Sequence, residues 1–388
     1  MIFRICLLFT LLVTRPVSAD SLSDHINAFI AEKQTPGLVL MVVKDGQVLR
    51  HEAFGVADLA TQTPMRTDAI FRFYSMSKPI TAVALLQLID AGKLQLNTSL
   101  HSILPVFADQ PPITMQQLLT HTAGFGYGGS FDSFTGLRYF WVNPMDQEGK
   151  TLAESMQALA SLPPLHEPGT AWTYGMASDV QGAVIEQVTG QPLPQYLQQH
   201  VFLPLGMTDT GFYVQSHQRA RLTAQHDVFA IPFVHKWFYR DDDVTEASTL
   251  PPKLVSGGGG LVGTVADYMK FAQWLLQEPG TATLLSAALR EQMLQNQLPA
   301  GVGRLPDEVY SNSGYGFGLG VKLVDEAYLS QGSVYWAGKG GSLFWVDRKR
   351  KLAVVAAMPL TGAARGLEKR LVPWVYEWLQ EPSRRAAH

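Results

Sequence analysis

Short apolar runs near both ends of the chain predict β-strands. These runs occupy 38–43 and 47–54 near the start, and 316–324, 334–336, 343–347 and 352–358 near the end. Asp45-Gly46 separates the first two runs, and this dipeptide is typical of a tight hairpin turn. The strand signals therefore gather at the two ends of the chain.

Apolar residues at helical spacing replace the strand pattern in the middle of the chain. The clearest predicted helix is 77–91, where Ile80, Val83 and Ala84 share one face and Gly92 marks the end. Further helices are predicted at 114–120, 151–160, 178–189, 194–202, 264–277 and 283–296, with shorter ones at 23–32 and 372–379.

Strands at the ends and helices between them favour an α+β fold. The simplest packing is one antiparallel sheet, built from both chain ends and flanked by helices, with an inserted all-helical region. We assign 20–388 to a single unit, with the α/β part at about 20–75 and 300–380 and the helical part at about 76–299. Because no flexible linker separates the two parts, we expect them to share an interface.

The composition is that of an ordinary globular protein. Hydrophobic residues make up 46% of the chain, charged residues 16%, and the formal net charge is −3. Nothing is strongly basic, so nucleic acid is not an expected partner. A short basic run at 348–351 falls between two predicted strands, and we interpret it as a solvated turn.

The N-terminus has the pattern of a secretory signal peptide over 1–19. Arg4 precedes an apolar run at 5–13, and small residues follow at 17–19. That run is too short to span a bilayer, and no later segment is apolar for long enough. We expect an exported protein, periplasmic or secreted, without stable membrane insertion after cleavage. Cleavage would remove Cys6, the only cysteine, so no disulfide or thiolate site is expected.

Two long stretches, 125–144 and 211–260, lack a regular pattern and are rich in aromatic residues. Long loops in compact domains are usually functional or disordered, and so many aromatic residues argue against disorder. Phe125, Tyr127 and their neighbours either line an apolar substrate cleft or pack on the helical region. The sequence leaves both interpretations open.

Ser75 and Lys78 stand at the start of the clearest predicted helix. Residues three apart share a helix face, so the two side chains can meet. A serine hydroxyl becomes a good nucleophile when a neighbouring base takes its proton. Lys78 can be that base only when neutral, so we expect burial and the helix N-terminus to lower its pKa. The alternative is an ordinary helix start with a surface lysine.

Two further segments carry candidate site residues. Tyr174 can relay a proton to a leaving group if it lies beside the Ser75/Lys78 pair. The glycine-rich stretch 335–342 predicts a strand edge that a substrate can approach closely. Backbone N–H groups of Ser75 and Lys339 would then form an oxyanion hole. Alone, Tyr174 would be interpreted as a buried core tyrosine, and the glycine-rich stretch would fit a bulged hairpin equally well.

Together these motifs resemble the superfamily of serine β-lactamases, penicillin-binding proteins and related esterases, for which Ser-x-x-Lys and Lys-Thr-Gly are signatures. The resemblance covers nearly the whole chain after residue 19. Its supporting stretches are 55–58, 68–71, 118–124, 204–207 and 257–268. It implies a β-lactamase/transpeptidase-like fold, an acyl-enzyme on Ser75, Lys78 as general base, Tyr174 as proton relay, and no cofactor or metal.

Within the superfamily the chain looks most like family VIII carboxylesterases. Trp336-Ala337-Gly338 falls where those esterases carry Trp-Gly-Gly and where β-lactamases carry Lys-Thr-Gly. Trp336 thus replaces the cation that pairs with a β-lactam carboxylate, and Met176 replaces the asparagine of Tyr-x-Asn. The alternative register, on Lys339-Gly340-Gly341, fits less well the distance to Trp345-Val346-Asp347.

The resemblance therefore implies a small ester as substrate, bound by Trp336, Ala337, Gly338, Met176, Phe125 and Tyr127. A β-lactamase or D-Ala-D-Ala carboxypeptidase is the nearest alternative, and a non-catalytic cell-wall binding protein on the same fold is a distant one. Other hydrolase motifs are missing: no serine lies in Gly-x-Ser-x-Gly, and His-Glu-x-x-His does not occur. The acidic run at 241–243 is interpreted as a solvated loop.

Overall fold

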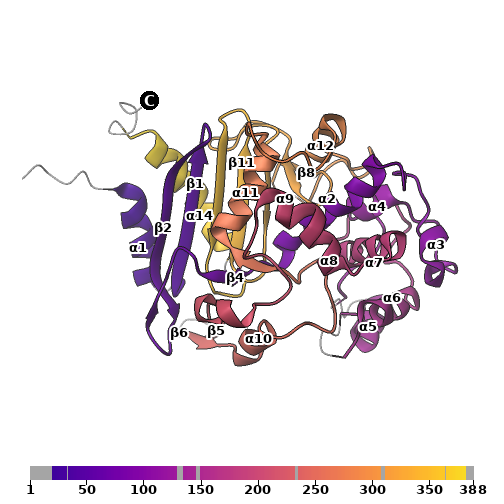
Figure 1. Ribbon diagram of the computed structural model, residues 1–388, viewed down its shortest axis with the longest axis horizontal. Helices are drawn as coiled ribbons and strands as arrows, with labels where there is room; N and C mark the ends of the chain where they lie inside the picture. Colours follow the sequence, from indigo (N-terminus) through magenta and orange to yellow (C-terminus); the bar gives the residue numbers. More distant parts are fainter. Residues whose placement is uncertain are drawn as a thin grey trace, which may run out of the picture.

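A computed structural model describes residues 20–32, 34–128, 134–145, 149–231, 235–306, 311–362 and 364–381, and it confirms the α+β architecture. Its main sheet has eight strands in the order β3-β2-β1-β12-β11-β10-β9-β8. β1 (Gly37–Lys44) lies antiparallel to β12 (Leu352–Ala357), with Val39 opposite Ala357. The two ends of the chain thus meet at the centre of one sheet (Figure 1).

The remaining strands mostly follow the predicted runs. They are β2 (Gln47–Asp58), β3 (Thr63–Pro64), β8 (Ser313–Tyr315), β9 (Gly320–Lys322), β10 (Val334–Ala337) and β11 (Ser342–Asp347). The prediction of one strand at 316–324 is wrong, because the chain turns back between β8 and β9. Gly318 makes this turn at φ +82, and an added Cβ would lie 2.8 Å from the Ala82 Cβ.

The sheet separates two apolar cores because successive side chains of a strand point to opposite faces. Leu38, Leu40 and Val42 of β1 face α1 (Ser21–Ala31) and α14 (Ala364–Leu379). Val39 and Val43 face the larger core, which includes α2 (Ser77–Asp90) and α11 (Val265–Leu276). Figure 1 shows α1 and α14 at the left and the helical region at the right.

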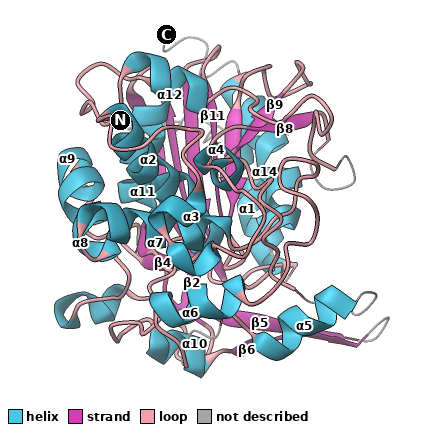
Figure 2. Cartoon of the chain, turned by 90° about the vertical axis from the view of Figure 1, so that its right-hand side faces the viewer, coloured by secondary structure: helices cyan, strands magenta, loops and turns pink. Residues whose placement is uncertain are grey.

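The inserted region is mostly helical and lies against one face of the sheet, but the prediction that it is all-helical is wrong, because it also contains three strands between residues 226 and 264. Its elements are η2 (Pro105–Phe107), α3 (Leu100–Ile103), α4 (Met115–Leu119), α6 (Leu152–Ala160), α7 (Ala177–Thr189), α8 (Leu193–Leu197), η3 (Gln198–Phe202), α9 (Leu203–Leu205) and α12 (Ala287–Met293). α4 and α6 each begin with a capping box, at Thr114 and Thr151. Figure 2 shows α3, α6 and α7 grouped together. α11 belongs to this part of the sequence yet packs on β1, β11 and β12, so the two parts share a core.

The two aromatic stretches contain more regular structure than the sequence predicts. The first includes α5 (Phe134–Val142). The second includes η4 (Ser216–Arg221), the hairpin of β5 (His226–Ile231) with β6 (His235–Arg240), and α10 (Asp242–Ala247). β7 (Val262–Thr264) then pairs with β4 (Ile70–Arg72), a few residues before Ser75.

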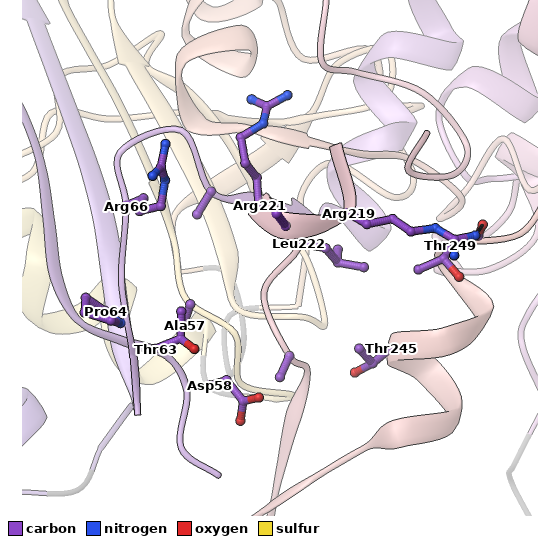
Figure 3. Close-up of a pocket in the computed structure, with 13 residues that line it drawn as sticks. Ala57, Asp58, Thr63, Pro64, Arg66, Arg219, Arg221, Leu222, Thr245 and Thr249 are labelled. Carbon is purple, nitrogen blue, oxygen red and sulfur yellow. Dashed lines mark hydrogen bonds between the residues drawn. The ribbon is translucent and has the colours of Figure 1, made fainter. Parts of the chain in front are cut away.

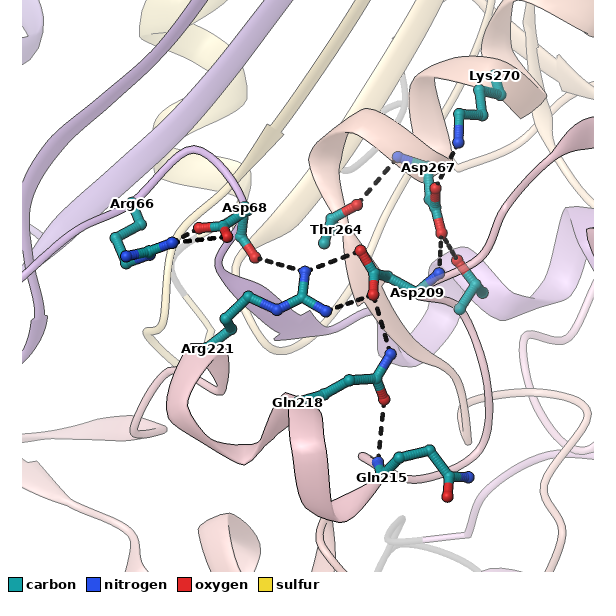
Figure 4. A network of polar contacts seen from close by, with 10 residues as sticks. Arg66, Asp68, Asp209, Gln215, Gln218, Arg221, Thr264, Asp267 and Lys270 are labelled. Atoms are coloured by element: carbon teal, nitrogen blue, oxygen red, sulfur yellow. Dashed lines mark hydrogen bonds and ion pairs between the residues drawn. The ribbon is translucent and has the colours of Figure 1, made fainter.

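A polar network fastens the start of the second stretch to the rest of the fold (Figure 4). Arg221 pairs with Asp209 and donates to the Asp68 carbonyl, while Arg66 pairs with Asp68 at 2.8 Å. Asp267, in the first turn of α11, accepts from the Asp209 backbone N–H at 2.6 Å. These contacts tie η4 to residue 68 and to the start of α11.

The predicted signal segment 1–19, including Cys6, lies outside the described residues, as do Phe131 and Phe233. Within the described part of the chain, no helix combines the length and apolar character that a membrane span needs.

Candidate active site

Ser75 lies in a short helical turn, η1 (Tyr74–Met76), that leads directly into α2. Tyr74, immediately before it, has φ +46, in the left-handed region that non-glycine residues rarely adopt. Such backbone conformations persist where the surroundings impose them, and they cluster at functional sites. The turn presents Ser75 at the N-terminal end of a helix whose buried residues include the whole first turn.

Lys78 is fully buried and meets three acceptors. Its Nζ lies 3.2 Å from the Ser75 Oγ, 2.8 Å from the Tyr127 hydroxyl and 2.7 Å from the Gly258 carbonyl oxygen. An ammonium group has three hydrogens to donate, and these three oxygens satisfy them. The Ser75 and Lys78 side chains thus meet as the sequence predicts. The Lys78 side chain is shielded from solvent.

Tyr127 and Tyr174 flank Lys78 because two segments run side by side. The Thr173 N–H donates to the His121 carbonyl at 2.8 Å, and the Met176 N–H donates to the Phe125 carbonyl at 3.1 Å. Gly175 between them has no room for a side chain, since a Cβ would lie 2.0 Å from the Phe125 oxygen. This pairing brings the two tyrosine rings to 5.6 Å, in an edge-to-face arrangement.

The two tyrosines meet Lys78 differently. Tyr127 accepts a hydrogen bond through its hydroxyl, whereas the Tyr174 ring lies with its centroid 4.7 Å from Nζ, within cation–π range. From the sequence, Tyr127 is predicted only as a residue that lines the cleft. Its hydrogen bond to Lys78 is not predicted by any motif. Gly258 is also missed; the run of four glycines at 257–260 was its only signal.

The expectation of a lowered Lys78 pKa is wrong in direction. Burial alone lowers the pKa of Lys78, but the neighbouring Tyr127 and Tyr174 oxygens and the Asp179 carboxylate outweigh it and raise the pKa above 10.5. The Tyr127 ring is partly exposed, but desolvation of its hydroxyl outweighs the charge of Lys78 and raises the pKa of that hydroxyl above its usual range. The resting pair is therefore a lysine ammonium beside a neutral phenol at pH 7.

His121 supports this arrangement rather than taking part in it. It is buried, and its Nδ1 accepts a 3.4 Å hydrogen bond from the Gly175 N–H. Its ring lies 5.3 Å from the Tyr174 ring. Burial, together with the charge of Lys78, holds the pKa of His121 well below 6.5, so it stays neutral near pH 7.

The end of β10 packs against the nucleophile turn. An added Cβ on Gly338 would lie 2.1 Å from the Phe73 carbonyl oxygen, and one on Gly340 would lie 2.6 Å from the Tyr74 ring. The Ser342 hydroxyl donates to the same Phe73 carbonyl at 3.0 Å. Glycines at 338 and 340 therefore allow the Lys339 backbone to approach the turn that carries Ser75.

The other residues predicted to bind substrate occupy different environments. Trp336 is 2% exposed, and its ring lies 5.6 Å from that of Tyr174 and 5.2 Å from that of Tyr315. Met176 and Phe125 are buried in the main core, while Ala337 is half-buried and Tyr127 is 40% exposed. The structure thus brings Tyr127 and Gly338 to the Ser75 region and makes Trp336 a support for the Tyr174 ring.

A cavity of about 690 Å³ is lined by Tyr74, the residue before Ser75, but by neither Ser75 nor Lys78. Its lining combines apolar side chains, among them Phe212 and Leu254, with the charged Arg72, Glu246 and Lys253. Part of the aromatic stretch 211–260 therefore does border open space beside the site.

A second cavity, of about 250 Å³, lies at the sheet edge between β3 and η4 and is lined by Arg66, Arg219 and Arg221 (Figure 3). Arg66 and Arg221 already pair with carboxylates, and Arg219 donates to the Thr249 carbonyl at 3.1 Å. This cavity contains neither Ser75 nor Lys78. In the described ranges, no three His, Cys, Asp or Glu side chains gather as metal ligands would.

Comparisons with known proteins identify the family of the chain. The family model described as "Beta-lactamase" matches residues 22–371. Esterase EstB of Burkholderia gladioli is 31% identical over 380 residues, covering 87% of this chain and 91% of EstB. A lovastatin esterase of Penicillium rubens is 29% identical over 376 residues, covering 82% of this chain and 88% of the relative.

Among solved structures, EstCE1, titled a hydrolase with promiscuous acyltransferase activity, superposes with a TM-score of 0.79 at 27% identity. The alignment covers 92% of this chain and 98% of EstCE1. Family match, relatives and fold all extend over the segments that hold Ser75, Lys78 and Tyr174. The chain belongs to the beta-lactamase family.

Proposed function

We propose that the protein is a serine carboxylesterase that works through an acyl-enzyme on Ser75. The observation that carries this proposal is the buried contact between the Lys78 Nζ and the Ser75 Oγ, at 3.2 Å, at the start of α2. A nucleophile within hydrogen-bond reach of a base is the arrangement that acyl transfer needs. The esterase relatives support carboxylic esters as the substrate class.

In the first step, the Ser75 Oγ attacks the ester carbonyl carbon and its proton passes to Lys78. Lys78 can accept a proton only after one proton has left the Lys78–Tyr127 pair, so the pair titrates as a unit. The C–O bond to the alcohol then breaks, and Tyr174 relays a proton to the departing oxygen. In the second step, water attacks the acyl carbonyl carbon and gives one proton to Lys78; the bond to the Ser75 Oγ then breaks, Lys78 returns the proton to Ser75, and the acid leaves.

The carbonyl oxygen gains negative charge during both steps. The backbone N–H groups of Ser75 and Lys339 are the proposed donors to it. The close approach of Gly338 and Gly340 to residues 73 and 74 supports this pairing. Losing one such donor typically costs on the order of 10²–10³ in rate.

Simple esters are the proposed substrates rather than β-lactams. Where β-lactamases carry a lysine, this chain carries the buried Trp336, which lies against Tyr174. The cavity beside Tyr74 is lined by both charged and apolar side chains, and its apolar part, with Phe212 and Leu254, would contribute about 25 cal/mol per Å² of apolar ester surface that it buries. The kcat/KM for p-nitrophenyl butyrate should therefore exceed that for benzylpenicillin on one preparation, and the reverse ratio would favour the β-lactamase alternative.

Covalent labelling tests the proposal directly. A fluorophosphonate probe should label the wild-type protein on Ser75, and Ser75→Ala should neither be labelled nor hydrolyse p-nitrophenyl butyrate. Ser77→Ala is a matched control, since Ser77 is buried in the same turn and its hydroxyl accepts from the Leu261 N–H at 3.1 Å. Labelling that survives in Ser75→Ala would contradict the proposed nucleophile.

Export through the signal segment 1–19 is a further part of the proposal. It predicts a mature chain that begins at Asp20 and is recovered outside the cytoplasm. N-terminal sequencing of the secreted or periplasmic fraction would test it, and an intact Met1 would contradict it.

A further inference from the structure

One buried acid near the site has no role in the mechanism above. Asp179, in the first turn of α7, is 0% exposed. Its Oδ1 accepts hydrogen bonds from the Ser256 hydroxyl at 2.5 Å and from the Gly258 N–H at 3.1 Å. Among the described residues, its Oδ2 has no hydrogen-bond partner. A buried carboxylate is costly, so its place here requires a compensating contact or charge.

The two hydrogen bonds connect Asp179 to the base through one peptide. Gly258 donates its N–H to Asp179, and its carbonyl accepts from the Lys78 Nζ at 2.7 Å. The preceding carbonyl, of Gly257, accepts from the Thr81 hydroxyl at 2.7 Å. Lys78 and Thr81 both lie on α2, so the glycine segment is held between α2 and α7.

The glycine segment packs so closely on α7 that no side chain fits at residues 257 and 258. A Cβ on Gly257 would lie 2.5 Å from the Ser178 carbonyl oxygen, and one on Gly258 would lie 2.7 Å from the Asp179 Oδ2. The Gly258 carbonyl is the one acceptor of Lys78 that cannot donate in return. It therefore fixes one N–H direction of the amine, and the other two positions point to Ser75 and Tyr127.

We propose that Asp179 is a positioning residue for Lys78: its carboxylate holds the Gly258 peptide, and that peptide turns the amine toward Ser75. The inference rests on the proposed function, because it concerns the base of that reaction. It assigns a role to a side chain that touches neither Ser75 nor the substrate path.

The charge of Asp179 has a second consequence. The titratable groups that face Lys78 are Tyr127 and His121 from one segment, Tyr174 from the next, and Asp179 from α7. Burial raises the pKa of Asp179, and the Ser256 hydrogen bond and the charge of Lys78 oppose that rise. The charge of Asp179 in turn acts to keep Lys78 protonated. Removing the negative charge should therefore make the neutral amine available at lower pH.

Asp179→Asn tests both parts, because asparagine keeps an acceptor oxygen but loses the charge. We expect kcat for p-nitrophenyl butyrate to fall by roughly 10²-fold with KM little changed, since small misplacements of a catalytic group cost about this much. We also expect the alkaline rise of kcat, and of the fluorophosphonate labelling rate, to shift to lower pH. Glu186→Gln is the charge-matched control: it lies further along α7, where it accepts from the Leu193 N–H.

Two further variants distinguish the positioning of the Gly258 peptide from the effect of the Asp179 charge. They also test the inference if Asp179→Asn does not fold. Ser256→Ala removes one hydrogen bond to the carboxylate, and Gly258→Ala crowds it; both keep the charge. Both should lower kcat without moving the alkaline rise. An active wild type with unchanged kcat and pH profile in Asp179→Asn, or fully active Ser256→Ala and Gly258→Ala, would overturn the inference. A wild type without esterase activity would instead contradict the proposed function.

Discussion

The two segments that flank Lys78 each contribute a tyrosine, but the two tyrosines contact the amine through different groups. On one side, Tyr127 directs its hydroxyl to the Nζ at 2.8 Å. On the other, Tyr174 presents its ring at 4.7 Å, and Trp336 and His121 pack around that ring. The first side is partly exposed, whereas the second is a packed aromatic cluster.

The difference assigns two tasks to two residues: one tyrosine tunes the protonation of Lys78, and the other exchanges a proton with the leaving group. Burial lowers the pKa of Lys78, and of the groups that raise it Tyr127 has the largest effect and is the tyrosine whose hydroxyl bonds the amine. A hydroxyl not committed to Lys78 remains available to exchange a proton with the leaving group. We therefore assign the tuning of the base to Tyr127 and keep the proton relay with Tyr174.

Lys78→Arg removes the feature that both sides share, so it should have the largest effect. A guanidinium keeps the charge but does not deprotonate in proteins, so the rate of ester hydrolysis should fall by about 10⁴-fold. The measurement is kcat/KM for p-nitrophenyl butyrate at several pH values. Lys322→Arg is the matched control, because Lys322, the last residue of β9, is also buried but forms an ion pair with Glu326. A fully active Lys78→Arg enzyme would leave a tyrosine as the base.

Tyr174→Phe should come next, because it deletes the relay but keeps the aromatic packing. General acid–base groups contribute typically 10²–10⁴-fold, and we expect a loss of about 10²-fold in kcat. The loss should be smaller for esters with good leaving groups, which need no proton. Tyr315→Phe, in the same aromatic cluster, is the control. An equal loss for p-nitrophenyl and ethyl esters would argue against a relay.

The wild-type rate should rise with pH because the active form has lost one proton from the Lys78–Tyr127 pair. Since the pKa of Lys78 lies above its usual 10.5, the rise should continue through the ordinary lysine range, at about tenfold per pH unit. Ser75→Ala at each pH corrects for spontaneous ester hydrolysis. A plateau that begins near neutral pH would show that the buried amine is already neutral there.

Tyr127→Phe should have the smallest effect on rate and the clearest effect on pH dependence. Without its hydroxyl, the ammonium form of Lys78 loses an acceptor, so the alkaline rise should move to lower pH. We expect kcat to change by about tenfold or less, in line with the loss of one hydrogen bond. Tyr139→Phe, a buried tyrosine whose hydroxyl donates to the Pro163 carbonyl, is the control. If Tyr127→Phe lost as much activity as Tyr174→Phe, the division between the two sides would be wrong.

Local patterns in the sequence predict the frame of the fold well. The strands at both ends, the Asp45-Gly46 turn and the helix after Ser75 follow from periodicity and turn chemistry, and all three are present. The β8–β9 turn was missed because a glycine-rich apolar run has the same composition as a continuous strand. The direction of the Lys78 pKa was missed because it depends on oxygens from residues 127, 174 and 179. Those residues are distant in sequence, and no spacing rule brings them together.

The pairing of β1 with β12 also bears on how the molecule is made. During synthesis, the edge of β1 that pairs with β12 stays unpaired until more than 300 further residues have been added, because Val39 pairs with Ala357. Contacts of such long sequence separation slow folding and leave strand edges open in the meantime. The Lys339 backbone reaches the nucleophile turn only from this late-arriving half of the sheet, so activity should emerge only after that half has been synthesised and has paired.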